Sequence, residues 1–161
     1  MDEGFVLDSS PLIALGGVGR LDLVAALARE VVVPEQVAAE VSRVGDEASR
    51  ALTDSAFTIA QVQPHPLVVP WGLGSGETAV LSFAKSQRQF VAVVDDLAAR
   101  RCASSIGVLC RGTLGLVLLA KTRQLIPSAA DLLAELEQSG LYLSRDLVEY
   151  GLGLVGETPG D

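Results

Sequence analysis

The amino-acid sequence predicts one α/β domain, built as a three-layer α/β/α sandwich around a parallel central sheet of about five strands. Short β-branched runs alternate along the chain with segments of helical periodicity, and this alternation is typical of right-handed βαβ units. The run Phe90–Val94 is apolar throughout, as expected of a central strand that is buried on both faces. The chain has 161 residues, 49% of them hydrophobic, which suits one full core. We expect a domain over residues 1–157 and a frayed tail over residues 158–161.

The amino-terminal segment predicts a strand that delivers an acid to one edge of the sheet. Phe5–Leu7 is short and apolar, and Asp8 follows it directly. Pro11 suits the first turn of a helix because its missing N–H would be unpaired there, and Ser9 or Ser10 can cap the next free N–H groups. Taken alone, Asp8 is better explained as an ordinary turn residue, so a functional role depends on whether other acids reach the same edge.

The rest of the first half predicts two helices separated by glycines, a β-branched strand, an amphipathic helix and a further strand. The helical pair and the two strands are expected at Pro11–Leu15, Leu21–Leu27, Val31–Pro34 and Phe57–Val62. The apolar stripe of the amphipathic helix comprises Val37, Val41, Val44 and Ala48. Glu40 lies on the rim of this stripe, whereas Glu35 is turned about 140° away, so Glu40 is better placed to face a pocket.

The second half continues the alternation after a proline-interrupted connection in which His65 is expected to be a loop residue without a catalytic role. A helix start at Gly74 places Glu77 in the first turn, where the helix dipole favours a carboxylate. The central strand ends in the doublet Asp95-Asp96. The expected later elements are a helix over Leu97–Ser104, a strand over Val108–Cys110, a helix after Gly112, and two helices around Ser139 and Gly140.

The charge is unevenly distributed. The net charge is −8, which argues against a nucleic-acid partner, yet the segment Thr78–Leu125 holds seven basic and only two acidic residues. Such a segment is compatible with a basic face beside an acidic pocket and equally with solvated helix faces. The basic residues that would line the path of a nucleic-acid substrate on such a face are Arg100, Arg101, Arg111, Lys121 and Arg123.

The chain shows no targeting or membrane-spanning signal. The acidic start lacks the basic region and apolar run of a signal peptide, and the longest apolar run, Leu114–Ala120, is far shorter than the roughly 18 to 20 residues of a membrane span. Cys102 and Cys110 lie in apolar surroundings without metal-type spacing, so we expect reduced core thiols. The protein is therefore expected to be soluble and cytoplasmic.

Four separate segments carry acids toward the same edge of the predicted sheet. Asp8 and the Asp95-Asp96 doublet end buried strands, while Glu40 and Glu77 lie on helices that follow a strand or loop. Close carboxylates repel one another unless a cation binds them, and oxygen ligands favour Mg²⁺ or Mn²⁺ over zinc. Such a site suits hydrolysis of a phosphodiester.

At these residues the sequence resembles the PIN-domain ribonucleases, in particular the small prokaryotic toxin-like proteins of the DUF3368 type. The matching motifs are the stretch from Asp8 to Val24, in which SPLIALGGVGRLDLV follows Asp8 and Ser9, and the later stretches VVVPEQVAAEV, GSGETAVLSFA, VVDDLAARR and RGTLGLVLLAKTRQLIPS. The resemblance implies that Asp8 is the first metal-binding acid, Glu40 the helix glutamate, Glu77 the third acid, and Asp95 or Asp96 the last. Glu77 stands where many VapC-type toxins carry aspartate, and the doublet leaves open which aspartate binds metal.

The leading hypothesis is a metal-dependent endoribonuclease that cleaves single-stranded RNA, as the toxin of a type II toxin–antitoxin pair. Asp8, Glu77, Asp95 and Asp96 would hold the metal, with Glu40 a ligand or an orienter of water. Ser10 and Thr113 would hydrogen-bond the acids or the scissile phosphate, or serve only as structural caps.

Two partners and two rival hypotheses complete the expectation. The high apolar content predicts an exposed apolar patch on helices such as Pro11–Leu27, of the kind that marks protein contacts. The resemblance to PIN toxins implies a homodimer and an antitoxin whose tail reaches the acidic pocket, where an arginine could satisfy a carboxylate pair. One rival is a catalytically silent PIN-fold module that binds RNA or a protein. The other is a general α/β domain whose acids are solvated caps.

Overall fold

Five short parallel strands form one sheet in the order β3-β2-β1-β4-β5, so that the first strand of the chain lies at its centre. The computed structural model describes residues 3–45, 49–50, 52–53 and 56–160. The strands are β1 (Gly4–Leu7), β2 (Val31–Pro34), β3 (Phe57–Ala60), β4 (Phe90–Val93) and β5 (Cys110–Arg111). This topology confirms the predicted α/β fold with a five-stranded parallel sheet.

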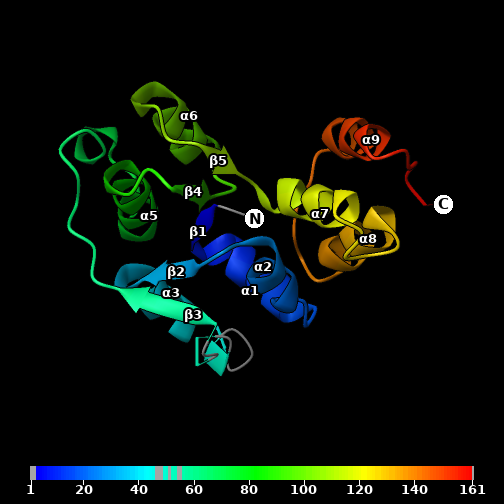
Figure 1. The fold of residues 1–161 in the computed structure, drawn as a ribbon, viewed down its shortest axis with the longest axis horizontal. Helices are drawn as coiled ribbons and strands as arrows, with labels where there is room; N and C mark the ends of the chain where they lie inside the picture. The colour runs from blue at the N-terminus through cyan, green and yellow to red at the C-terminus, as the bar shows by residue number, and fades with distance from the viewer. Residues whose placement is uncertain (1–2, 46–48, 51, 54–55, 161) are drawn as a thin grey trace.

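Helices cover both faces of the sheet (Figure 1). The described helices are α1 (Ser9–Gly17), α2 (Asp22–Leu27), α3 (Glu35–Ser42), α5 (Ser75–Ser86), α6 (Leu97–Ile106), α7 (Thr113–Thr122), α8 (Ala129–Gln138), α9 (Arg145–Leu154) and the 3₁₀ helix η1 (Val69–Trp71). Helices α1 and α2 pack with α7 and α8 on one side, and α5 packs with α6 on the other. Helix α3 contacts both α1 and α5, and α9 packs against α7.

The sheet centre is the core of the molecule. All four residues of β1, β2 and β4 are buried, whereas the edge strand β3 exposes its middle. Leu7 pairs with Val93, and the next N–H, that of Asp8, donates to the Val93 carbonyl at 3.0 Å. The backbone that leaves β1 is therefore held against the end of β4.

The tail is anchored as far as Glu157. Its carboxylate accepts the N–H groups of Ala129 and Ala130 at 2.9 and 3.0 Å and the Ser128 hydroxyl at 3.2 Å, at the start of α8. Lys121 lies 3.3 Å from the same carboxylate. Residues 158–160 beyond it form neither helix nor strand.

Several predicted boundaries shift. Helix α1 begins at Ser9, so Pro11 is its third residue, and Asp8 rather than a serine occupies the N-cap. Val44 is 59% exposed because α3 ends at Ser42, which corrects its place in the predicted stripe; Ala48 lies outside the described residues. The last strand begins two residues later than predicted and ends one residue later.

The surface differs from the expectation in one respect. The large apolar side chains of α1 and α2 are buried or half-buried, so the patch predicted on Pro11–Leu27 is wrong in position. Exposed large apolar side chains lie instead along η1 and its flank and along α9. Cys102 is buried, Cys110 is half-buried, and both are free thiols. None of the helices in the described ranges is long and apolar enough to cross a membrane.

Candidate active site

The carboxyl ends of the strands bring the predicted acids to one edge of the sheet. Asp8 follows the central strand β1 and Asp95 follows its neighbour β4. Their charges interact with one another, and the charges of Glu40 and Glu77 also act on Asp8. Since Asp96 in turn acts on Glu77, all five predicted acids belong to one electrostatic cluster. We call these five residues the acidic cluster.

Asp8 is the least solvated member of the acidic cluster. It is 5% exposed, and burial raises the pKa of its carboxyl from 3.8 to about 7. The backbone N–H of Ser9 lowers this pKa, while the charges of Glu77, Glu40 and Asp95 raise it further. Within the described ranges, no lysine or arginine forms an ion pair with Asp8. The site therefore holds a buried carboxyl among like charges, a setting that a cation would stabilise.

Glu40 ties three helices together. The Ser9 hydroxyl donates to Glu40 Oε2 at 2.7 Å, and the Gly76 N–H donates to Oε1 at 3.0 Å. A Cβ at Gly76 would stand 2.5 Å from Glu40 Oε1, so any side chain there would displace the Glu40 carboxylate from this position. Glu40 faces inward and Glu35 is exposed, in agreement with the helical spacing. Both oxygens of Glu40 are therefore held by hydrogen bonds to α1 and α5.

Glu77 lies in the first turn of α5, half-buried, and its Oε2 accepts the Gly74 N–H at 3.2 Å. Burial raises the pKa of its carboxyl, the Gly74 bond lowers it, and the charges of Asp96 and Glu40 raise it. Glu77 thus links Asp96 and Glu40 electrostatically within the acidic cluster.

The two aspartates of the doublet have different partners. Asp95 accepts the Thr113 N–H at Oδ1 and the Thr113 hydroxyl at Oδ2, both at 2.7 Å, which fixes it to the start of α7. Asp96 is exposed and caps α6 by accepting the Ala99 N–H at Oδ2, 2.9 Å away. Its Oδ1 has no hydrogen bond to any described residue. Asp96 therefore has one oxygen without a hydrogen bond to a described residue, whereas each oxygen of Asp95 accepts one hydrogen bond.

The predicted substrate-binding residues fall into two groups. Arg100 lies beside Asp95, with its Nη1 3.3 Å from the Val94 carbonyl, and Arg111 is half-buried just before α7. Exposed Arg101 is on α6, exposed Ser10 is at the start of α1, and Thr113 is fully buried against Asp95. These five residues lie at or near the strand ends.

Lys121 and Arg123 form the second group, at the far end of α7. That end is about 12 Å from Thr113 at 1.5 Å per residue. Lys121 donates to the Pro127 carbonyl at 2.6 Å and pairs with Glu157, while Arg123 donates to the Leu27 carbonyl at 2.9 Å. The structure does not bring these two residues to the acidic cluster.

The residues present fit a hard divalent cation by their chemistry. The donors are carboxylate oxygens around a buried, unpaired Asp8, and Mg²⁺ takes one or two such carboxylates and keeps several waters. In the described part of the chain, no three His, Cys, Asp or Glu side chains are already arranged around a common metal position. Asp8, Asp96 and Glu77 are the residues that would hold the ion, with the other two acids held in place by hydrogen bonds.

Sequence reasoning missed three contributors to this site. The pattern indicates Ser9 only as a helix cap, yet its hydroxyl holds Glu40. Gly76 leaves room for Glu40. Gly112 leaves room for Asp95 and Arg100, because a Cβ at Gly112 would stand 3.0 Å from Asp95 Oδ1 and 3.2 Å from Arg100 Nη1. Glycines directly before or inside a helix start are the signal that could have found them.

This fold and this acidic edge define the class of protein. Among solved structures, the PIN domain endonuclease Utp24 matches with a TM-score of 0.52 and 10% sequence identity, over 69% of this chain and 85% of that chain. At this identity the likeness shows the fold alone, a PIN nuclease fold. A family model described as DUF3368, a PIN domain, matches residues 4–157, and the chain therefore belongs to this family. Among curated protein sequences, none matches.

Proposed function

We propose that this protein is a metal-dependent endoribonuclease that hydrolyses single-stranded RNA. The observation that carries the proposal is Asp8, a carboxyl buried at the end of the central strand, under the charges of three other acids and unpaired with any described basic residue. A bound Mg²⁺ or Mn²⁺ would polarise the phosphodiester and lower the pKa of an attacking water.

In this proposal, side chains of the protein would bind the ion, position the acids and bind the phosphate. Asp8, Asp96 and Glu77 would provide oxygens for the ion, and Thr113 holds Asp95 through both carboxylate oxygens of Asp95. Glu40 fixes the starts of α1 and α5 around them. Arg100, beside Asp95, supplies the positive charge that a phosphate needs next to so many carboxylates.

RNA cleavage by the purified protein tests this proposal. A labelled single-stranded RNA should be cut in Mg²⁺ or Mn²⁺ and left intact in EDTA. Asp8→Asn should abolish cleavage and leave the circular dichroism spectrum unchanged. Equal cleavage by Asp8→Asn, or in EDTA, would rule out the mechanism.

A catalytically silent PIN-fold module is the second candidate, and a specific observation favours it. Glu40 and Asp95 have both oxygens bonded within the protein, and no three acids in the described ranges converge on one point. Binding of single-stranded RNA without cleavage in Mg²⁺ or Mn²⁺ would select this candidate.

We further propose a role as the toxin of a type II toxin–antitoxin pair, in the cytoplasm, as a homodimer held in check by an antitoxin. The support is the family membership and the exposed apolar side chains Leu67, Val69 and Trp71 along η1, which suit a protein contact. Expression without the neighbouring gene should arrest growth, and light scattering should give a dimer mass. A monomer without toxicity would favour the silent module.

A further inference from the structure

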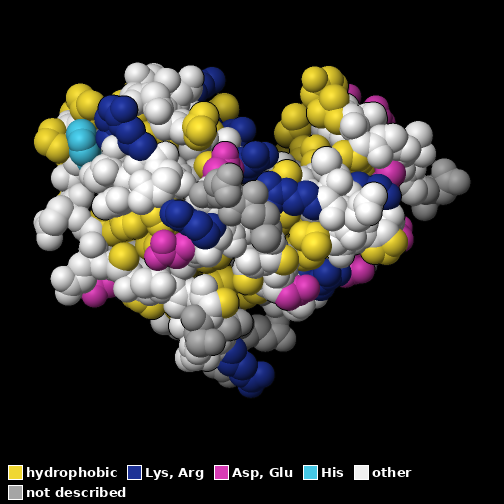
Figure 2. All heavy atoms as spheres, viewed as in Figure 1, with side chains coloured by type: hydrophobic (Ala, Val, Ile, Leu, Met, Phe, Trp, Pro, Cys, Tyr) yellow, Lys and Arg dark blue, Asp and Glu magenta, His cyan; other side chains and the backbone are white. Residues whose placement is uncertain are grey.

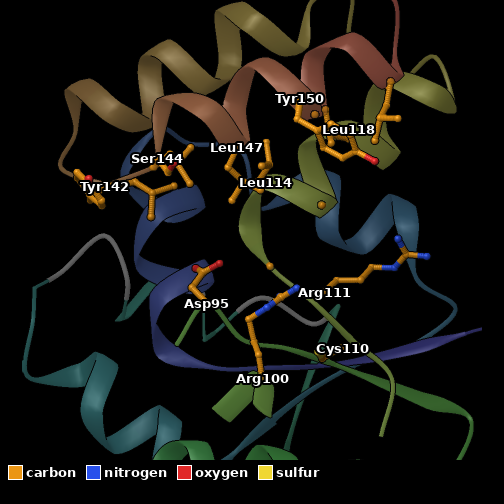
Figure 3. Close-up of a pocket in the computed structure, with 16 residues that line it drawn as sticks. Asp95, Arg100, Cys110, Arg111, Leu114, Leu118, Tyr142, Ser144, Leu147 and Tyr150 are labelled. Atoms are coloured by element: carbon orange, nitrogen blue, oxygen red, sulfur yellow. The ribbon is translucent and has the colours of Figure 1, made fainter. Parts of the chain in front are cut away.

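A groove of about 560 Å³ opens beside Asp95 and runs between α7 and α9. Figure 3 shows two unlike walls. Apolar side chains of α7 and α9, among them Leu114 and Leu147, form one wall, and Asp95, Arg100 and Arg111 lie across from them. In Figure 2 the groove coincides with a notch beside α9, with acidic and basic side chains at its bottom. Its volume is in the range of ligand-binding clefts.

Two tyrosines lie along the α9 side of this groove, and they are the only tyrosines of the protein. Tyr142, just before α9, is 89% exposed, and Tyr150, in the second turn of the helix, is 68% exposed. Leu147 between them is 51% exposed. Such a row of exposed rings and apolar side chains has no role in the core, so it indicates a surface that contacts a ligand.

The opposite wall carries positive charge without acidic partners. Neither Arg100 nor Arg111 forms an ion pair within the described ranges. Arg100 is held by the Val94 carbonyl and stands beside Asp95 where Gly112 leaves room for both. Its remaining N–H groups are available to an anion close to the acidic cluster.

We propose that this groove binds the RNA strand on one side of the cleaved bond, with bases against Tyr142 and Tyr150 and phosphates at Arg100 and Arg111. This inference rests on the proposed nuclease function and adds where the substrate lies. A single strand has flat apolar bases along one side and phosphates along the other, which matches the two walls; base stacking on aromatic rings beside basic side chains is how such strands are bound. In a duplex the bases are stacked inside the helix and could not reach the tyrosines.

The chemistry of the groove favours RNA over a partner protein. An apolar helix would cover the leucines but would leave two arginines buried without anions, which is costly. A nucleic acid satisfies both walls at once.

Fluorescence anisotropy with a labelled single-stranded RNA of about 12 nucleotides, in EDTA to prevent cleavage, tests the assignment. Tyr142→Ala and Tyr150→Ala should each weaken binding about tenfold, in line with the cost of losing one stacked base. Tyr142→Phe and Tyr150→Phe keep the rings and should bind like the wild type. Val44→Ala, which truncates an exposed apolar side chain outside the groove, is the matched control.

The outcomes separate this inference from the proposed function. Unchanged RNA binding by the doubly substituted Tyr142→Ala/Tyr150→Ala protein overturns the groove assignment, and if Asp8→Asn still abolishes cleavage the nuclease proposal stands. A wild type that neither binds nor cuts RNA overturns both. If the double alanine variant instead loses dimer mass in light scattering and keeps RNA affinity, the groove is a protein interface. Thermal melting confirms that each variant is folded.

Discussion

Replacing Asp8 by asparagine should stabilise the metal-free protein. Folding raises the pKa of the Asp8 carboxyl from 3.8 to about 7. At about 1.4 kcal/mol per pH unit, ionised Asp8 therefore lowers the free energy of unfolding by about 4 kcal/mol. Asparagine has nearly the same shape, can accept the Ser9 N–H, and carries no charge. Because the chain relaxes around an ionised Asp8, we expect a measured gain of about 1 to 3 kcal/mol at pH 8.

The pH dependence gives this prediction its sign. Below pH 3.8 the carboxyl is protonated in both folded and unfolded chains, so wild type and Asp8→Asn should differ little. Between pH 3.8 and about 7 the folded state keeps a proton that the unfolded state has lost, so the stability of the wild type falls relative to the variant as the pH rises. Above about pH 7 both states are ionised and the difference stays constant.

Urea unfolding in EDTA at pH 5, 6, 7 and 8 measures this difference. Asp146→Asn, at an exposed aspartate of α9, is the matched control and should show no comparable trend. Adding Mg²⁺ should then stabilise only proteins with Asp8, by about 1.4 kcal/mol at ten times the dissociation constant. A gap between wild type and Asp8→Asn that is independent of pH would falsify the reasoning.

Three further predictions test the residues that hold the acidic cluster in place and the basic residues proposed to bind RNA. Thr113→Val should lower the free energy of unfolding by about 1 to 3 kcal/mol and slow RNA cleavage, because Asp95 loses the hydroxyl bond at Oδ2; Thr113→Ser should restore both in urea unfolding and cleavage assays. Gly76→Ala should destabilise the protein by clashing with Glu40, and a double-mutant cycle with Glu40→Ala should show coupling of about 0.5 kcal/mol or more. Arg100→Gln and Arg111→Gln should each reduce the slope of log affinity for single-stranded RNA against log salt by about 0.7; Lys121→Gln and Arg123→Gln, at the far end of α7, should leave it unchanged.

The fold and the composition of the acidic cluster could be predicted from local pattern. Parallel strands end at one edge of a sheet, so Asp8 and the doublet after β4 had to meet there once the strands were recognised. Helical periodicity separated Glu40 from Glu35 for a similar reason, because the buried face of α3 is set by spacing alone. Both arguments need only the order of residues within a single element.

Features that depend on how elements pack were not predictable in this way. The charge count could not distinguish Arg100, beside Asp95, from Lys121, which pairs with Glu157 at the other end of α7. The groove exists because α9 packs on α7 at Gly151, where a Cβ would stand 2.9 Å from Leu118. The spacing of residues in the sequence does not predict a contact between Gly151 and Leu118, which are far apart along the chain.

The acidic cluster also explains how the protein can fold before it binds a metal. Helices α1 and α6 begin directly after Asp8 and Asp96, α5 carries Glu77 in its first turn, and the first residue of α7, Thr113, binds Asp95. Four of the acids accept a backbone N–H near a helix start, namely Glu40 from Gly76, Glu77 from Gly74, Asp95 from Thr113 and Asp96 from Ala99, and the Ser9 N–H lowers the pKa of Asp8. These N–H groups and the helix dipoles offset part of the negative charge. They do not offset the cost of burying the Asp8 carboxylate, and this burial is the largest cause of its raised pKa. The proposed metal would therefore be an addition to a folded site, and if it binds, EDTA should lower the melting temperature without unfolding the chain.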